Sequence, residues 1–199
     1  MSATILGIAI LCSGCIRSLQ PIYTDEDLVF EPGLVCEWSE SGSQEVWTFT
    51  KDDTGGYALV YTDNEKRQGR FKAHLARLDG KLFLDLYPEE MDSKTNGLYL
   101  FHLMPVHTFM YVEQINPTLR MSYPSSDWLE KLLKTNPDAI RYESVDGEII
   151  LTADSKELQA FWLRHLGTEG AFGEQSNMEC KQPGAPETKS NVPGVNNGR

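Results

Sequence analysis

Short runs of β-branched and aromatic residues, separated by turn-forming residues, recur through the middle of the chain. This pattern is typical of β-strands joined by tight turns. Nearly every run reaches its neighbour through a short connection, which favours an up-and-down antiparallel sheet. Such a sheet removes its exposed edges by closing into a barrel. We predict strands at residues 34–39, 45–51, 57–63, 70–78, 81–87, 98–103, 106–114, 119–123, 140–145 and 148–152.

Two Asp-Gly pairs, Asp79-Gly80 and Asp146-Gly147, stand between neighbouring runs. Asp-Gly readily adopts the positive φ values of a two-residue hairpin turn, so each pair predicts a β-hairpin. A two-residue turn also determines which side chains of the two strands meet. At the first turn Leu75 is then opposite Leu84, and both belong to an apolar face.

Apolar residues follow helical spacing in two segments, residues 127–135 and residues 154–166. The second segment begins with Asp154 and Glu157, which have the spacing of a capping box. Its aromatic stripe is typical of a helix that packs on a sheet. We therefore predict a single, mainly β domain, with an antiparallel barrel-like sheet and a C-terminal helix packed outside it.

The first residues form an uncharged apolar stretch that is followed by Ser13, Gly14 and Cys15. Length and order fit the apolar core and cleavage region of a secretory signal. The run Leu11-Cys12-Ser13-Gly14-Cys15 resembles the lipobox of bacterial lipoproteins, in which a small residue precedes a lipid-bearing cysteine. The resemblance implies a signal peptide at residues 1–14, cleavage after Gly14, a diacylglyceryl group on Cys15, and an amino terminus acylated by a chain such as palmitate. The alternative is a buried strand or helix that ends in Ser-Gly-Cys.

A second resemblance lies at the start of the β-rich region. The run Leu34-Val35-Cys36-Glu37-Trp38 is similar to the Gly-x-Trp opening strand of lipocalin-like barrels, with Cys36 in the place of the glycine. The resemblance implies that this run is the first strand of a barrel.

The two ends of the domain differ from its middle in composition. Residues 15–32 are polar and contain proline, which predicts a lipidated tether, or alternatively an ordered arm on the domain. The globular domain then covers residues 33–166. Residues 167–199 are nearly free of aliphatic side chains and are predicted to be disordered. We expect Cys36 to be a small buried hydrophobe rather than the disulfide partner of Cys180.

Charge and hydropathy limit the partners of the chain. The 199 residues carry a formal net charge of −11, with a pI of about 4.8. Such a surface repels phosphate backbones, so nucleic acid is not an expected partner. No apolar run approaches the roughly 20 residues of a membrane-spanning helix. Lipid on Cys15 is therefore the expected attachment to a membrane, with the domain in the cell envelope, outside the cytoplasm.

One pair of side chains is a candidate for chemistry. The turn at Asp79-Gly80 places His74 opposite Asp85, and a carboxylate could orient a histidine for acid–base catalysis. Glu89 and Glu90 follow on the same segment. The alternative, which we favour, is a cross-strand ion pair on a hydrated face. The sequence contains no metal-binding, phosphate-binding or nucleophile motif, so no metal or cofactor is expected.

Two functions are consistent with these observations. The first is a non-enzymatic envelope lipoprotein that binds a small apolar ligand or an envelope protein through the barrel mouth or an exposed face. The second is a hydrolytic or isomerising enzyme that uses His74 and Asp85. An enclosed apolar cavity would favour ligand binding, and an open cleft at the pair would favour chemistry. A filled barrel with neither feature would favour a scaffold that binds a partner.

Overall fold

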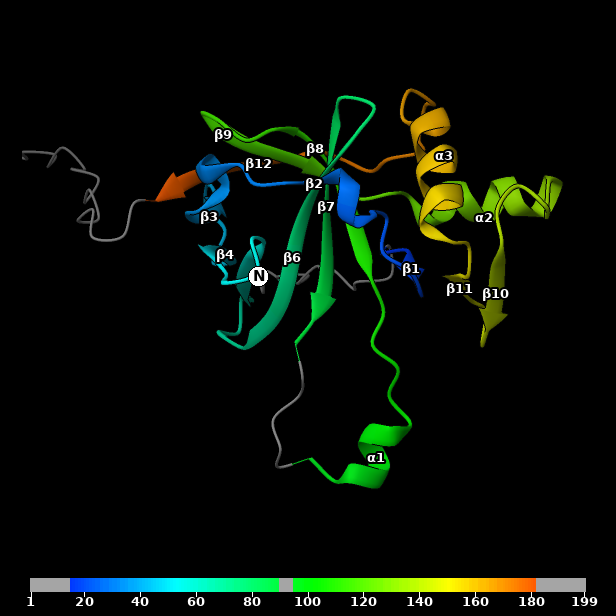
Figure 1. The fold of residues 1–199 in the computed structure, drawn as a ribbon, viewed down its shortest axis with the longest axis horizontal. Coiled ribbons are helices and arrows are strands. Elements are labelled where there is room, and N and C mark those ends of the chain that lie inside the picture. The colour runs from blue at the N-terminus through cyan, green and yellow to red at the C-terminus, as the bar shows by residue number, and fades with distance from the viewer. Residues whose placement is uncertain (1–14, 90–94, 182–199) are drawn as a thin grey trace, which may run out of the picture.

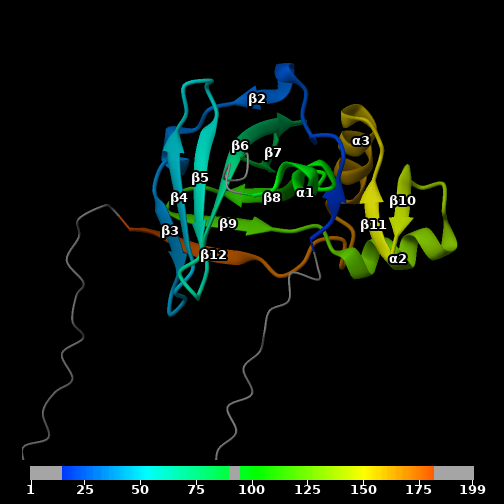
Figure 2. The same cartoon turned by 90° about the horizontal axis from the view of Figure 1, so that it is seen from below.

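A computed structural model describes residues 15–89 and 95–181. Within these residues eight strands form a closed antiparallel barrel, so the predicted fold class is confirmed (Figures 1 and 2). Around the barrel the order is β6-β5-β4-β3-β12-β9-β8-β7, and β7 returns to pair with β6. The strands are β3 (Glu37–Glu40), β4 (Val46–Lys51), β5 (Tyr57–Thr62), β6 (Gln68–Leu78), β7 (Lys81–Pro88), β8 (Thr108–Gln114), β9 (Thr118–Ser122) and β12 (Ser176–Lys181).

Both Asp-Gly turns are present as predicted. The φ angles are 46° at Asp79 and 76° at Gly80, and they are 53° at Asp146 and 85° at Gly147. Positive φ at both turn residues matches the right-handed twist of the strands that the turn joins. The predicted register of β6 and β7 is also confirmed, since Leu75 pairs with Leu84. The second turn joins β10 (Tyr142–Val145) to β11 (Glu148–Leu151).

Large side chains from all around the barrel pack together in its interior. Trp38, on the strand that resembles a lipocalin opening strand, is fully buried, and its indole N–H donates to the carbonyl of Leu34 over 2.9 Å. Aromatic and aliphatic residues from the other strands surround it. Side chains with 0 or 1% exposure in this interior are Leu34, Trp38, Phe49, Tyr57, Leu59, Ala73, Leu75, Leu84, Met110 and Leu119.

A second core lies outside the barrel, on the outer face of β6, β7 and β8. Helices α2 (Ser126–Thr135) and α3 (Ser155–His165) cover this face together with β11, as Figure 1 shows at the right of the barrel. Phe83 and Phe109 project outward into this core and contact the helix layer, where Trp162 of α3 is fully buried. The expected C-terminal helix outside the sheet is therefore α3.

The chain before the barrel is an ordered arm, so the predicted tether is wrong and its alternative holds. Strand β1 (Arg17–Ser18) pairs in parallel with β11, and β2 (Leu28–Val29) pairs with β6. Two short 3-10 helices, Asp25–Asp27 and Pro32–Leu34, belong to the same arm. Ile16 and Ile22 are buried in the outer core, which explains why a polar, proline-containing segment is ordered. The predicted signal peptide, residues 1–14, lies outside the described residues.

The chain after α3 is also part of the domain, which corrects the predicted disorder of residues 167–181. Strand β12 lies between β3 and β9 and pairs with both, so it closes the barrel. Cys180 forms a disulfide with Cys36 of the facing segment, with the two Cα atoms 5.8 Å apart. The composition argument failed because a strand paired on both edges is held by backbone hydrogen bonds, and it needs few apolar side chains. Residues 182–199 lie outside the described residues.

The predicted strand at residues 98–103 is also wrong. Its first residues form a short helix, α1 (Gly97–Phe101), in a segment that projects from the barrel between β7 and β8 (Figure 1). The side chain of Asn96 accepts hydrogen bonds from the N–H groups of Leu98 and Tyr99, which starts the helix. A short, continuous apolar run does not distinguish a strand from a helix, because it has no periodicity.

Candidate functional site

The structure places His74 and Asp85 opposite each other on β6 and β7, as predicted, but they do not form the expected ion pair. Asp85 is fully buried under the N-terminal arm, and its carboxylate lies 2.7 Å from Nδ1 of His107 on β8. His74 has another partner, since its Nδ1 lies 3.1 Å from the hydroxyl of Tyr23 in the arm. The hydrated face that we expected is thus covered.

Asp85 holds the arm in place. The backbone N–H of Ile22 donates to Oδ2 of Asp85 over 3.1 Å, and the carbonyl of Ile22 accepts from the side-chain amide of Gln159 on α3 over 3.0 Å. Both polar groups of this buried residue are therefore satisfied by side chains from the barrel and from the helix layer. An unsatisfied backbone group in such a place costs about 1–3 kcal/mol. The buried carboxylate has a clear structural role.

The covered environment changes how the neighbouring groups titrate. Burial lowers the pKa of His74, and the negative charge of Asp85 opposes that shift. Burial also raises the pKa of Tyr23 to about 12, with the charge of Asp85 acting in the same direction. Both shifts arise from a dehydrated layer between the arm and the sheet. A catalytic pair needs access for a substrate, and Asp85 has no exposed surface.

The other candidates for chemistry do not complete this cluster. Glu89 follows β7 and is hydrogen-bonded through its backbone to Arg70, and Glu90 lies outside the described residues. Phe109 and Tyr111, which follow His107 on β8, belong to the outer core. Among residues 15–89 and 95–181, no group of three His, Cys, Asp or Glu side chains is placed to hold a metal ion.

His74 gives the stability of the domain a dependence on pH. Its pKa is lowered in the folded state, so the unfolded chain binds a proton more tightly, and stability falls as pH drops below the ordinary value of about 6.5. We expect urea unfolding to show a lower midpoint at about pH 5.5 than at about pH 7.5, and a smaller difference in His74→Asn. Equal differences in the two proteins would contradict this role.

The barrel mouth holds a small, acidic depression. Its volume is about 170 Å³, and Glu40, Glu45 and Glu174 stand among the residues that line it. Met121 and Met178 close it from the interior side. Ligand pockets of drug-sized molecules are larger, about 300–1,000 Å³. The mouth therefore offers little to a small apolar ligand.

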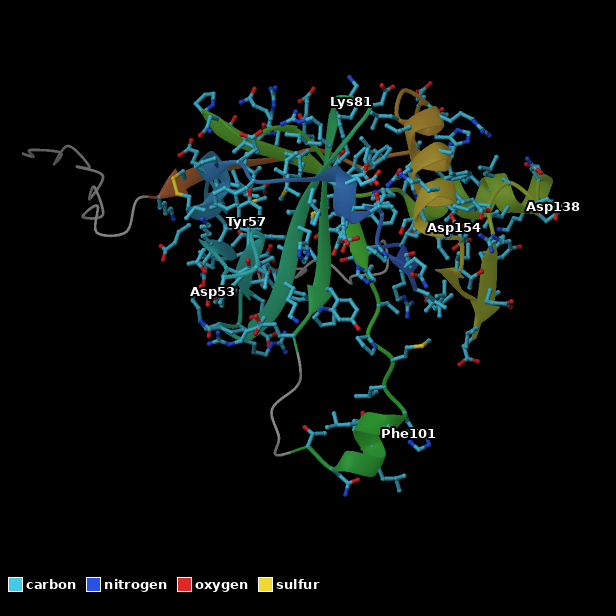
Figure 3. The ribbon with its side chains drawn as sticks, viewed as in Figure 1. Asp53, Tyr57, Lys81, Phe101, Asp138 and Asp154 are labelled. Atoms are coloured by element: carbon cyan, nitrogen blue, oxygen red, sulfur yellow. A yellow bond between two sulfur atoms is a disulfide. The ribbon has the colours of Figure 1, made fainter. Side chains whose placement is uncertain are left out.

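The segment between β7 and β8 has a different character. We call residues 95–106 the apolar finger, because most of its side chains are apolar and it contains no Asp, Glu, Lys or Arg. Phe101 is 84% exposed, Leu98 is 72% exposed and Met104 is 64% exposed. Figure 3 shows the side chain of Phe101 far from the barrel. Large apolar side chains that are exposed together in one segment are a common feature of surfaces that contact a partner or a membrane, which makes the finger a candidate site.

An open groove separates the finger from the sheet. Its volume is about 890 Å³, and its lining combines apolar residues of the finger with polar residues at the ends of β6 and β7. The groove continues the apolar surface of the finger, so we treat the two as one candidate site. The lining residues are Lys72, Tyr87, Pro88, Glu89, Leu100, Leu103, Met104 and Pro105.

The base of the finger lies against the start of the arm. Ser18 and His107 exchange two backbone hydrogen bonds, of 2.9 Å and 2.8 Å. Cys15, the predicted lipid site, is partly exposed and precedes Ser18 by three residues. Ile16, the next residue, is already buried. The predicted lipid site and the finger are thus joined to the barrel at one place.

Comparison with known proteins adds no relative. No protein-family model, no curated protein and no solved structure matches the chain. In the described parts of the chain, no helix is both long and apolar enough to cross a membrane.

Proposed function

We propose that this chain is a non-enzymatic lipoprotein of a bacterial cell envelope, held to a membrane by lipid on Cys15. In this proposal the barrel is a scaffold that presents the apolar finger to a binding partner. The observation that carries it is the finger, where large apolar side chains remain exposed on an otherwise well-packed domain. A soluble domain without a partner for such a surface would be prone to aggregate.

The disulfide supports a location outside the cytoplasm. Cytoplasmic proteins keep their thiols reduced, whereas exported proteins retain disulfides. Cys180 of β12 is joined to Cys36, which directly precedes β3, and a bond of this kind would form and persist in an oxidising compartment. The lipobox-like segment independently supports export.

The filled interior of the barrel and the buried surroundings of Asp85 favour a scaffold over binding of a small apolar ligand and over catalysis. Aromatic side chains such as Trp38, Phe49 and Tyr57 occupy the interior where a lipocalin-like barrel would hold a ligand. The alternative of a hydrolytic or isomerising enzyme relied on His74 and Asp85. Asp85 is buried beneath the arm and bonded to it, which favours a structural role.

Replacement of the lipid-bearing residue tests this proposal. We expect Cys15→Ser to lose stable membrane anchoring and metabolic incorporation of a palmitate analogue, because serine lacks the thiol that carries the diacylglyceryl group. Fractionation of cells grown with the analogue measures both properties. Cys12→Leu is the matched control: it replaces a nearby cysteine, keeps Cys15, and should remain labelled and membrane-bound. Labelling of Cys15→Ser at the wild-type level would contradict the proposal.

A further inference from the structure

We infer that the apolar finger is a second membrane contact, which inserts its exposed side chains into the interface of the bilayer that anchors Cys15. This inference rests on the proposed lipid anchor and names the partner of the finger as lipid. Figures 1 and 3 show the finger projecting away from the barrel, with Phe101 labelled on it.

The composition of the finger fits the interface of a bilayer. Leu98, Tyr99 and Phe101 in its helix are 72%, 60% and 84% exposed, and Met104 follows at 64%. Leucine and phenylalanine partition into the acyl region, and tyrosine prefers the headgroup level. Asn96 caps the helix, so its first N–H groups are satisfied by the chain itself rather than by water. The cap lowers the backbone cost of placing α1 in the polar interfacial layer of a bilayer, where water and headgroups still satisfy the irregular residues after it.

The lack of charge favours lipid over an ionic partner. The whole chain carries a net charge of −11, yet residues 95–106 contain no Asp, Glu, Lys or Arg. An acidic protein is repelled by anionic headgroups. The charged residues of the β7–β8 connection, Glu89, Glu90, Asp92 and Lys94, all precede residue 95 in the sequence, so residues 95–106 are its part with the lowest electrostatic cost of approaching such a surface. Binding of the finger should then depend on apolar area and only weakly on salt.

The ordered arm brings the finger to the membrane. A flexible tether would let the domain sit far from the bilayer, but here the chain is packed from Ile16 onward. Lipid on Cys15 would thus hold the domain directly against the headgroups. Because Ser18 is hydrogen-bonded to His107 at the base of the finger, the finger starts beside the anchored end. Two anchors at one site would also limit rotation of the domain on the membrane.

Depth-dependent fluorescence quenching tests this inference on the whole lipidated protein, which begins at Cys15 in this proposal. Phe101→Trp places a tryptophan near the end of the finger, and Val145→Trp places one at an exposed apolar site in the β10–β11 hairpin, where Val145 is 53% exposed. The wild-type protein supplies the background of the four native tryptophans. The proteins are reconstituted in phosphatidylcholine vesicles with or without brominated acyl chains.

We expect brominated lipid to quench the added emission of Phe101→Trp and to leave that of Val145→Trp unchanged. Equal quenching at both sites, or none at residue 101, would overturn the inference. A blue shift at residue 101 that occurs without vesicles and rises with protein concentration would also overturn it, since it would assign the finger to contact with a second copy of the chain.

A second experiment separates the contribution of the finger to membrane binding from that of the lipid anchor. Cys15→Ser protein that begins at residue 15, and so carries neither lipid nor the apolar signal segment, is mixed with phosphatidylcholine vesicles and floated. We expect weak binding that Phe101→Ser reduces by about tenfold, as expected for loss of one large apolar side chain from an interface, and that Val145→Ser leaves unchanged. Binding that none of these substitutions alters would overturn the finger as a contact. An unmodified Cys15 in native protein would instead refute the lipid anchor alone.

Discussion

Deletion of the chain from Ser176 onward is expected to abolish cooperative folding. The deletion removes β12, and with it the backbone pairing of both β3 and β9. The barrel is then open along two edges, and the interior that Met178 helps to close is exposed. A domain of this size has a net stability of about 5–15 kcal/mol, and losing a barrel strand and a disulfide together removes most of it. Circular dichroism during heating measures the loss of the transition.

Two further variants separate the contribution of β12 to stability from that of the disulfide. A chain that ends at Lys181 keeps every described strand pairing and is the matched control, which should unfold cooperatively. Cys180→Ala keeps β12 but loses the cross-link between residues 144 positions apart, so we expect an intermediate loss of about 2–5 kcal/mol. An unchanged melting temperature after deletion from Ser176 would show that β12 is not an integral strand of the barrel.

Replacement of Asp85 by alanine is expected to have the second-largest effect, about 3–5 kcal/mol of the free energy of unfolding. The carboxylate is fully buried and bonded to His107 and to the N–H of Ile22. Removing it leaves two buried polar groups without their partner, beneath an arm that water does not readily enter. Urea unfolding at neutral pH measures the change, and Asp85→Asn should cost less because its amide oxygen still accepts from Ile22.

Asp53 provides the control for this substitution. It is an exposed aspartate in the turn between β4 and β5, labelled in Figure 3, and Asp53→Ala should change stability by no more than about 0.5 kcal/mol. If Asp85→Ala costs less than about 1 kcal/mol, as exposed ion pairs do, then the arm does not depend on this carboxylate.

Local chemistry predicted the barrel hairpins well. At Asp79-Gly80 the turn residues themselves dictate the backbone angles, and the turn then dictates which side chains of β6 and β7 meet. Nothing distant is needed to place His74 opposite Asp85. The helix at residues 154–166 was predicted for the same reason, because its capping residue Asp154 and its apolar stripe lie within one short segment.

Contacts between distant segments were beyond such reasoning. β12 joins the barrel through backbone hydrogen bonds to β3 and β9, and the side chains of Ser176–Lys181 carry little sign of them. The arm was missed for a related reason, since Ile16 and Ile22 have their contacts on helices that come much later in the chain. The disulfide was missed together with β12, because Cys180 was predicted to lie in a disordered tail and not in a strand.

The contact between Asp85 and His107 could not be predicted, because the long finger separates their two strands in the sequence. β7 and β8 are joined by the long projection that contains α1, and no tight turn sets their register. His107 comes beside Asp85 only after β8 pairs with β7. The finger itself reads as a buried strand, since its apolar run has the composition of one. Exposing this apolar run does not stabilise the fold, and features of that kind are expected at functional surfaces.

The mass of the intact protein, isolated from its membrane, tests the lipid anchor most directly. Top-down fragmentation of the same sample locates any modification on the chain. We expect a chain that begins at Cys15, with a diacylglyceryl group on its sulfur and an acyl chain on its amino terminus. A chain that retains Met1 and carries an unmodified Cys15 would contradict the anchor, and with it the proposed role of this barrel as a membrane-held scaffold.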